Sequence, residues 1–299
     1  FDAAGNAVGT EEQWYLTKIE KTVNDDTEVL LDGADNSYAL WRNTNDTLRK
    51  RLGDLRYRTN EQDGDGLWAR YVGGKFGSGS FDYNLFQLGY DKADNEKSTY
   101  GFAIDRGTGK AGYSSGSSKD KLLSGSLYGT WYGEKGNYTD VVARIGQFST
   151  DIKSYGEYAD KADYKAHAYS LSVEYGKTIK VNREQGTFIE PQVQFTAGRL
   201  GSAHYTTDRG TEVYAGGMNS FIGRVGLVAG QKAKDGRSDF YIKGSLLHEF
   251  GGERDITMQA ANGETLATSK DYGDTWFELG LGTNIKLSKT SQFYGDIER

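Results

Sequence analysis

The stretch TWFELGLGTNIKLS, residues 275–288, alternates two kinds of side chain along its whole length. One set is large and apolar: Phe277, Leu279, Leu281, Ile285 and Leu287. The other set is mixed, with polar and small members: Trp276, Glu278, Gly280, Gly282, Asn284 and Lys286. Because successive side chains of a β-strand point to opposite faces, this period of two predicts a long strand with one apolar face.

The same alternation recurs along the chain, as in HAYSLSVEYGK (167–177) and, less strictly, in NSFIGRVGLVAGQ (219–231). We predict eleven strands, with approximate cores at 67–76, 82–91, 98–107, 121–133, 138–149, 165–178, 187–199, 219–231, 238–250, 273–287 and 291–299. Strands in soluble sheets are most often about five to six residues long. A tilted strand that crosses a bilayer needs about 9–11 residues. The length of these strands therefore favours a membrane barrel.

Composition alone leaves two classes of all-β protein open. The 299 residues include no cysteine, 41 glycines and 21 tyrosines, and the net charge is −6. The lack of cysteine excludes a disulfide framework and thiolate metal sites, and the acidic balance argues against a nucleic-acid partner. The mean hydropathy of −0.69 is typical of a water-soluble protein, such as a β-sandwich binding protein. A membrane barrel also fits, because it exposes apolar residues to lipid only at every second position.

The connections between the predicted strands alternate between shorter and longer. After the short GSGS and KADNEK come the long TGKAGYSSGSSKD and the short EKGN, then STDIKSYGEYADKAD and IKVNREQ. The last two pairs are LGSAHYTTDRGTEVYAGGM with KAKDGR, and GGERDITMQAANGETLATSKDY with SKT. Outer-membrane barrels show this asymmetry, with short periplasmic turns and longer external loops. We therefore predict an all-β fold, a transmembrane antiparallel up-and-down β-barrel.

A helical segment is predicted before the barrel, in DDTEVLLDGADNSYALWRNTNDTLRKRLGDLR (25–56). Its second part can be capped by Asp35, Asn36 or Ser37. Residues at helical spacing form an apolar stripe: Ala39, Leu40, Thr44, Leu48, Leu52 and Leu55. Around the stripe the charge is mainly basic, and some 20–30 helical residues would span about 30–45 Å, roughly a membrane thickness.

This basic helix is predicted to lie in the pore. The residues expected to carry that role on the helix are Arg42, Arg49, Lys50, Arg51, Leu52, Gly53, Asp54 and Arg56. The carboxylates on the predicted inward faces are Asp105, Glu174, Glu190, Glu278, Asp296 and Glu298. A cationic helix in the lumen would be held by these groups. The alternative is an amphipathic helix packed outside the barrel, on its periplasmic surface.

Several motifs then resemble one family in order along the chain. LRKRLGDLR (48–56) and GLWARYVGGK (66–75) are followed by FQLGYDK (86–92), YGFAIDR (100–106), GSLYGTWYG (125–133), FIEPQVQFTAGRL (188–200) and FYGDIER (293–299). From about residue 38 to 299 the chain resembles the autotransporter β-domain, the translocator of type V secretion. The resemblance implies a twelve-stranded barrel in the outer membrane of a Gram-negative bacterium. A helix at the C-terminal end of the exported passenger would thread the pore, with the passenger at the cell surface.

The resemblance also implies partners and a division of the chain. The expected partners are outer-membrane lipid, the outer-membrane barrel assembly machinery, periplasmic chaperones and the protein's own passenger, with no nucleic acid. Residues 1–34 would be the end of the passenger and a linker, where QWYLTKI (13–19) resembles a final passenger strand. Residues 35–66 would be the pore-threading helix and a linker, and residues 67–299 the barrel.

The stretch SQFYGDIER (291–299) looks like the first half of a strand. Bacterial single-chain barrels have an even number of strands, and an open edge in lipid leaves costly unpaired backbone groups. We therefore expect roughly 15–20 residues after Arg299, which would finish the eleventh strand and add a twelfth. The alternative is that another chain fills the gap.

No catalytic or cofactor site is predicted. Some members of the family cut themselves within the helix at an Asn–Asn pair, and alignment on Gly53–Arg56 places Asp46 and Thr47 at those positions. Asn45 is shifted by one residue, which turns its side chain by about 100° on a helix. Self-cleavage is therefore not favoured, and the three histidines show no metal-ligand spacing. The remaining alternative, a stand-alone porin, adhesin or barrel hydrolase, has no use for the segment 35–58.

Overall fold

The computed structural model describes residues 23–34, 36–44, 48, 66–76, 81–95, 97–182, 184–288 and 291–299. One large sheet dominates this part of the chain, and its strands neighbour one another in sequence order. They are β1 (Gly66–Phe76), β2 (Phe81–Asn95), β3 (Ser98–Tyr113), β4 (Gly116–Tyr132), β5 (Asn137–Ser154), β6 (Lys161–Lys177), β8 (Thr187–Leu200), β11 (Met218–Lys232), β12 (Ser238–Glu249), β15 (Thr275–Lys286) and β16 (Gln292–Glu298). Each corresponds to one of the predicted strands. The short β7 (Ile179–Asn182), which was not predicted, pairs only with β8.

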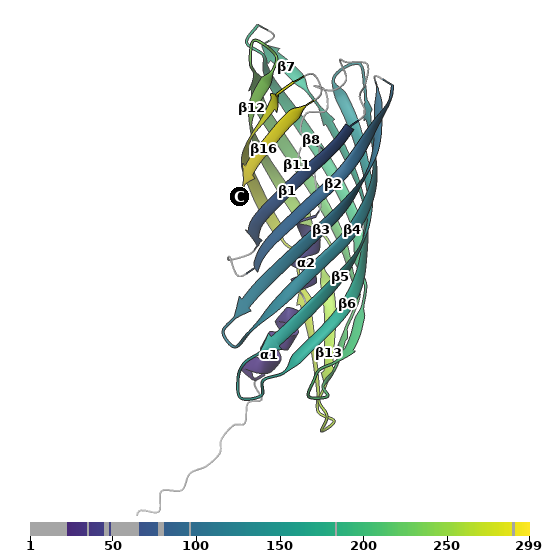
Figure 1. Ribbon diagram of the computed structural model, residues 1–299, viewed down its shortest axis with the longest axis vertical. Coiled ribbons are helices and arrows are strands. Elements are labelled where there is room, and N and C mark those ends of the chain that lie inside the picture. Colours follow the sequence, from purple (N-terminus) through teal and green to yellow (C-terminus); the bar gives the residue numbers. More distant parts are fainter. Residues whose placement is uncertain are drawn as a thin grey trace, which may run out of the picture.

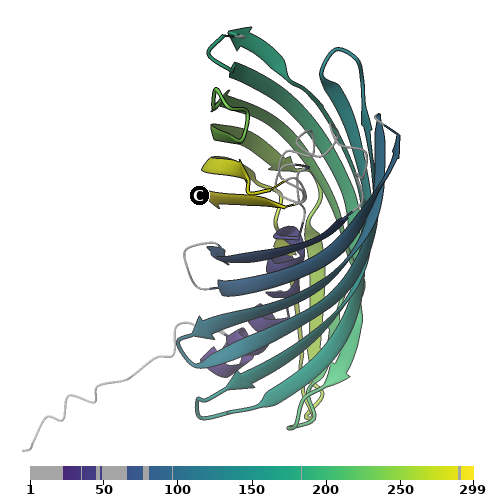
Figure 2. The same cartoon turned by 45° about the horizontal axis from the view of Figure 1, so that its top comes forward.

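Every pair in this sheet is antiparallel, so the up-and-down topology is confirmed. The sheet curls into a half-barrel with an opening between β1 and β16 (Figures 1 and 2). Within the described residues, neither β1 nor β16 has a strand partner on its outer edge. The additional strand expected from the sequence stays a prediction.

The convex face of the sheet is apolar and the concave face is polar. Phe277, Leu279 and Leu281 of β15 are 74%, 68% and 52% exposed on the convex side. On the concave side, charged residues such as Asp105 and Glu174 are buried. This arrangement is inverted relative to a water-soluble sandwich and is that of a barrel whose outer face meets lipid. No helix in the described segments is long and apolar enough to cross a membrane.

Two helices, α1 (Asp25–Gly33) and α2 (Asn36–Arg42), lie inside the curl of the sheet (Figures 1 and 2). Leu40 and Trp41 of α2 are almost completely buried. The position of these helices excludes, for the described part of the segment, packing on the periplasmic outside of the barrel. The remainder of the predicted pore helix lies outside the described residues, apart from Leu48.

A second sheet was missed by the sequence analysis. It has the order β14-β13-β10-β9 and consists of β9 (Ala203–Thr206), β10 (Glu212–Ala215), β13 (Glu253–Gln259) and β14 (Thr265–Asp271). These strands fall within the two longest predicted loops, 200–218 and 251–272, which is a correction. They continue the hairpins β8–β11 and β12–β15 beyond the large sheet, and we call them the outer flap.

Glycines lie at the junctions between the large sheet, which we call the wall of the barrel, and the outer flap. The N–H of Gly216 donates to the carbonyl of Asp255 at 2.7 Å, and Gly252 adopts a φ of 101°, a conformation that glycine reaches without a Cβ penalty. These breaks separate the flap strands from β11 and β12. At these breaks the alternation in the sequence stops, although strand pairing resumes a few residues later.

The predicted long connection TGKAGYSSGSSKD also forms strand for most of its length. Tyr113 pairs with Gly116, so only Ser114 and Ser115 separate β3 from β4. The long connections of the sequence are therefore largely an extension of the barrel wall at one end of the molecule. The longer wall lies at the end that carries α1 and β13 (Figure 1).

Candidate functional site

The helix α1 lies at the end of the barrel that carries the outer flap. Asn24 caps it, because its Oδ1 accepts the backbone N–H of Thr27 at 2.8 Å. The buried Asp26 then accepts the backbone N–H groups of Gly156 and Tyr158, both at 2.8 Å, from the connection between β5 and β6. Burial alone raises the pKa of Asp26, but these hydrogen bonds, another from the Ser154 side chain and the charge of Arg209 together hold the pKa below its ordinary value of 3.8. Asp26 therefore fastens α1 to the wall as a carboxylate.

Two glycines let α1 lie very close to the wall. A Cβ at Gly33 of α1 would lie 2.8 Å from the side chain of Ile152 on β5. A Cβ at Gly116 of β4 would lie 2.5 Å from Val29 Cγ1. Distances under 3 Å do not occur for real Cβ atoms, so both positions require glycine for this approach. Val29 and Leu30 are buried as a result.

The break between α1 and α2 is held from two sides. The carbonyl of Ala34 accepts the hydroxyl of Tyr164 on β6 at 2.8 Å and Nη1 of Arg254 on β13 at 2.8 Å. Arg254 is 1% exposed and also donates from Nε to the carbonyl of Gly216 at 3.0 Å. Arg254 thus connects the outer flap directly to the helical segment.

Further contacts join the two outer strands of the flap to α1 and to β6. Lys270 of β14 forms an ion pair with Asp32 of α1, with Nζ and Oδ1 2.6 Å apart. The ring of Tyr205 on β9 stacks on Tyr164, with centroids 4.9 Å apart and planes inclined by 12°. The flap therefore contacts the helical segment through an ion pair and hydrogen bonds, and contacts β6 through the stacked rings.

The helix α2 continues into the interior. Its Tyr38 donates a hydrogen bond from Oη to Glu249 Oε2 at 3.2 Å, and its Trp41 packs edge-on against Phe148, with centroids 6.3 Å apart. The guanidinium of Arg42 lies 3.4 Å from the ring centroid of Trp276, a cation–π contact. Arg42 is the one predicted pore-helix residue in the described segments, and it meets an aromatic ring.

Beyond α2, charged side chains of the wall contact the backbone of the residues that follow the helix. Arg144 of β5 donates to the backbone carbonyl of Thr44, and its Nε lies 3.3 Å from Asp105 Oδ2 of β3. Ser124 Oγ also donates to Asp105, at 2.8 Å. Arg144 and Asp105 are both buried. Asp105 therefore holds Arg144, and Arg144 in turn holds the chain at Thr44.

Glu174 of β6 makes the deepest described contact with the segment. The N–H of Leu48 donates to its Oε2 at 3.2 Å, and the hydroxyl of Tyr138 donates to its Oε1 at 2.5 Å. Arg224 Nη1 lies 4.0 Å from Glu174 Oε2 and its Nη2 donates to Gln192 at 2.7 Å. Glu174 is thus a predicted carboxylate that touches the described part of the helical segment directly, at Leu48.

The other predicted carboxylates have partners on the wall. Glu190 is buried and accepts from Gln192 Nε2 at 3.0 Å. Glu278 accepts from Trp276 Nε1 at 3.2 Å. Both carboxylates therefore accept hydrogen bonds from neighbouring residues of the wall.

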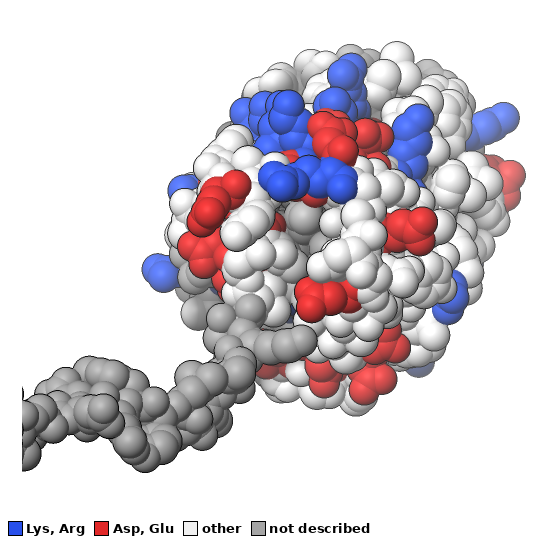
Figure 3. Space-filling view, turned by 90° about the horizontal axis from the view of Figure 1, so that it is seen from below, with Lys and Arg blue, Asp and Glu red and all other residues white. Residues whose placement is uncertain are grey.

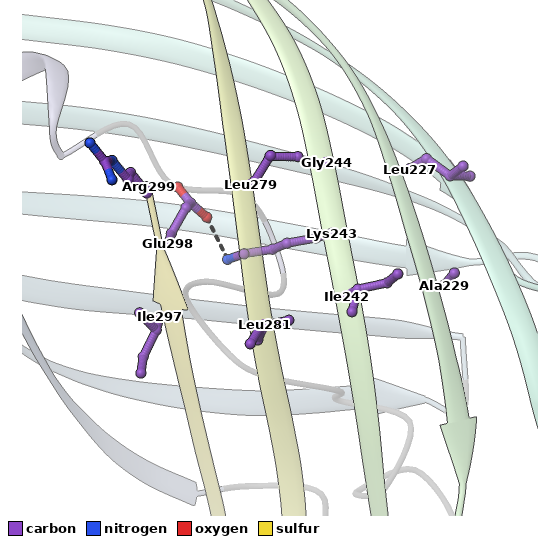
Figure 4. Close-up of a pocket in the computed structure, with 11 residues that line it drawn as sticks. Leu227, Ala229, Ile242, Lys243, Gly244, Leu279, Leu281, Ile297, Glu298 and Arg299 are labelled. Atoms are coloured by element: carbon purple, nitrogen blue, oxygen red, sulfur yellow. Dashed lines mark ion pairs between the residues drawn. The ribbon is translucent and has the colours of Figure 1, made fainter.

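Asp296 and Glu298 of β16 meet a lysine of the wall. Lys243 of β12 reaches across β15 to both carboxylates. Figure 4 shows its ion pair with Glu298, in which Nζ lies 2.6 Å from Oε2. It crosses at Gly280, where a Cβ would lie 2.6 Å from Lys243 Cε. An open and mainly apolar hollow of about 530 Å³ adjoins this point, between β11 and β16. This ion-pair cluster ties β16 to β12 across the intervening strand.

The structure does not describe most of the predicted pore helix. Arg49, Lys50, Arg51, Leu52, Gly53, Asp54 and Arg56 lie outside the described residues. The sequence analysis missed the wall residues Arg144, Arg224 and Glu249 and the flap residue Arg254. Arg144 and Arg224 were visible as charges on the inward side of an alternating strand, whereas Arg254 lay in a segment interpreted as a loop.

The side chains of the site are of kinds that bind a peptide segment. Among the described residues, no three His, Asp or Glu side chains are grouped so that they could hold a metal ion. The end of the barrel that carries α1 and the outer flap is called the outer mouth. Acidic and basic side chains are interspersed around its rim (Figure 3). Carboxylate, guanidinium and aromatic groups converge instead on the backbone of α1, α2 and the residues that follow. The arrangement holds a peptide segment inside a barrel.

The fold and the interior together define a class, an outer-membrane type of β-barrel with a helical segment held in its pore. The family model described as "Autotransporter beta-domain" matches residues 64–298. The chain belongs to the autotransporter β-domain family. It is an outer-membrane translocator domain, of the kind that exports an attached passenger to the cell surface.

Individual relatives agree with this assignment. The chain is 31% identical over 281 residues to the pertactin autotransporter of Bordetella parapertussis, covering 87% of this chain and 29% of that protein. It is 25% identical to the serine protease EatA of Escherichia coli O78:H11, covering 97% of this chain and 22% of that protein. The chain thus spans less than a third of the length of these relatives.

Solved structures show the same fold. The β domain of the Bordetella autotransporter BrkA superposes with a TM-score of 0.61 at 22% identity, covering 78% of this chain and 91% of that one. The transport unit of the Escherichia coli autotransporter AIDA-I superposes with a TM-score of 0.60 at 19% identity, covering 93% of each chain.

Proposed function

We propose that α1, α2 and the residues after them are the end of the passenger, retained in the pore after export. In this proposal one segment both closes the pore and tethers the passenger at the cell surface. The supporting observation is a series of contacts that follows the chain inward. It begins at Asp26 in the outer mouth, continues through Ala34 and Tyr38, and reaches Thr44 and Leu48.

The direction of the segment supports the same proposal. The helix α1 lies at the end with the outer flap and the long connections, and α2 lies deeper in the barrel (Figure 1). A passenger that precedes α1 in the sequence would then leave the pore at the external end. Arg49, Lys50, Arg51 and Arg56 are proposed to continue along the lumen toward its carboxylates. The division into residues 1–34, 35–66 and 67–299 remains part of this proposal, with α1 in the first part and α2 in the second.

Pore conductance tests the proposal. A variant that lacks residues 1–43 removes both helices, whereas a control that lacks residues 1–22 leaves α1 and α2 intact. In planar bilayers we expect a higher single-channel conductance for the first variant and the full-chain value for the control. Heat modifiability on a gel establishes that each barrel is folded. Equal conductance of two folded variants would contradict a pore closed by the helices.

We also propose that this domain carries out no catalysis and does not cut itself. Asn45, Asp46 and Thr47, where the family resemblance would place the cleavage site, lie outside the described residues. The proposal rests on the sequence, in which a carboxylate at position 46 stands where an asparagine amide is needed. The intact mass of the folded chain should stay at 33.0 kDa after prolonged incubation. A fragment beginning at residue 46 or 47 would show that the segment cleaves itself. Enzymatic activity of an attached passenger is a separate matter.

Assembly of the barrel is proposed to depend on the outer-membrane assembly machinery and on periplasmic chaperones. The supporting observation is the row of long strands with an apolar convex face, which cannot be left exposed in an aqueous compartment. Depletion of the assembly machinery should reduce the heat-modifiable, folded form of this domain in the outer membrane. Unchanged folding after depletion would contradict that dependence.

A further inference from the structure

One sector of the convex face carries a cluster of lysines at the external end. On β3 to β6, outward positions beyond the apolar surface hold Lys110, Lys119, Lys121, Lys153, Lys161 and Lys165, which we call the lysine band. Each is exposed. Two acidic residues, Asp151 and Asp163, share this face, and Asp151 lies 3.4 Å from Lys121 in an exposed ion pair. The sector is therefore strongly cationic.

The strand register places lysines directly opposite one another. Lys110 of β3 is the cross-strand partner of Lys119 on β4, and Lys153 of β5 is the partner of Lys161 on β6. Like charges in directly opposed positions destabilise an antiparallel pair. Aspartates of the same face flank these pairs: Asp82 is the other cross-strand partner of Lys110 and Asp151 that of Lys119, and Asp151 and Asp163 lie two residues from Lys153 and Lys161. These three carboxylates face six lysines, so the sector keeps a net positive charge that an external anion can neutralise.

The position of the lysine band along the strands shows which layer of the membrane it meets. Toward the other end of β4 the outward residues become apolar, with Leu123 and Leu127 62% and 68% exposed. They are followed by Trp131, whose Nε1 donates to Tyr100 at 3.1 Å. The path from Lys121 to Trp131 is about 33 Å long at about 3.3 Å per residue. At a strand tilt of about 40° this gives a height of about 25 Å, the height of the apolar band in outer-membrane barrels.

The lysine band thus lies at the boundary between the hydrocarbon and the external medium. Lysine side chains at such a boundary lay their stems along the apolar surface and extend the ammonium group into the headgroup layer. The pairs Lys110–Lys119 and Lys153–Lys161 are two strands (about 10 Å) apart across the sheet and two residues (about 7 Å) apart along it, so their centres are about 12 Å apart. A headgroup with two phosphates can contact both pairs.

We propose that the lysine band binds phosphate groups of lipid headgroups in the outer leaflet. The band gives the barrel a fixed lipid neighbour on the β3–β6 side. Toward the external ends of β8, β11, β12 and β15, the outward residues include a single arginine, Arg199, which donates to Asn219 Oδ1 at 2.7 Å, together with His248 and Thr275. The binding surface is therefore confined to one sector.

Lipid retention tests this proposal. The full chain is reconstituted in phosphatidylcholine nanodiscs with equal amounts of bisphosphorylated lipid A and its dephosphorylated form, and retained lipid is counted by native mass spectrometry. We expect the phosphorylated lipid to be preferred by roughly tenfold or more. The preference should fall as salt is raised above about 0.15 M, because the lysines are exposed.

Two matched variants locate the site. The band variant carries Lys110→Gln, Lys119→Gln, Lys153→Gln and Lys161→Gln and should lose the preference. The control variant removes four exposed lysines near the opposite end: Lys92→Gln, Lys135→Gln, Lys180→Gln and Lys234→Gln. It should retain the preference of the unmodified chain. Equal retention of both lipids by the unmodified chain, or a preference that survives in the band variant, would overturn the proposal.

Discussion

Single residues at the outer mouth decide how the helical segment is held. Asp26 and Arg254 act in opposite ways: one is a helix carboxylate that accepts from the wall, and the other is a flap guanidinium that donates to the helix. Both are buried. A buried polar group costs free energy when its partner is removed, so each residue makes the closed mouth depend on a specific contact.

Arg254→Met should loosen α1 without unfolding the barrel. The substitution removes one of the two donors to the Ala34 carbonyl, and a lost hydrogen bond of a charged, buried group costs about 1–3 kcal/mol. Hydrogen exchange of α1 amides should accelerate, while exchange in β3 to β5 stays unchanged. Lys270→Met is the control, because its partly exposed ion pair with Asp32 is worth about 0–1 kcal/mol. Equal effects of the two substitutions would contradict the assigned role of Arg254.

The anchoring of α1 should depend on pH through Asp26. Its pKa in the folded protein is below the ordinary value of 3.8, so its contribution to stability is present above pH 3.8. The contribution is lost as the pH falls through the folded pKa. Exchange of α1 amides, corrected for the intrinsic rate, should therefore rise in this acidic range. Asp26→Asn should show a smaller pH dependence, and an unchanged profile would assign the acid effect to other groups.

At the scale of elements, period-two alternation predicted eleven of the twelve strands of the large sheet, all except the short β7, and the inward and outward faces that were assigned on them. It could do so because lipid and lumen impose opposite polarities on alternate residues. The outer flap was missed because its strands have only 4 or 7 residues and lie beyond the lipid, where the outward face is polar. Contacts such as Arg254 with Ala34 join residues 220 positions apart, and no local pattern indicates them.

The contact between β12 and β16 depends on the absence of a side chain at Gly280 of β15, the strand between them. Gly280→Ala should displace Lys243, because the new Cβ would lie 2.6 Å from Lys243 Cε and 2.9 Å from the carbonyl of Ile297. We expect a loss of about 1–3 kcal/mol, seen as a lower temperature for loss of the folded band on a gel. Gly244→Ala is the control, since its Cβ would make an ordinary contact of 3.4 Å with Leu279. An equal loss in both variants would contradict the crossing by Lys243.

At the scale of the whole molecule, the barrel is a polar tube around a peptide segment. The wall supplies lipid contacts outside and charges inside, and the outer flap closes over the segment at the external end. The sequence predicted this plan from alternation, loop asymmetry and a basic helix. It could not predict which carboxylates meet the helix, because Glu249 and Glu174 are brought to it by the curvature of the sheet.

The central claim is that α1 lies inside the barrel against β5, and a disulfide tests it most directly. The chain has no cysteine, so Gly33→Cys with Ile152→Cys introduces a single pair at positions in close contact. Ile152→Cys with Leu279→Cys is the control, because Leu279 faces lipid and Gly33 remains glycine. In intact outer membranes, intact-mass analysis without reductant should show a disulfide in the first variant and free thiols in the control. Free thiols in both variants, in a folded barrel under oxidising conditions, would contradict the placement of the helix in the pore.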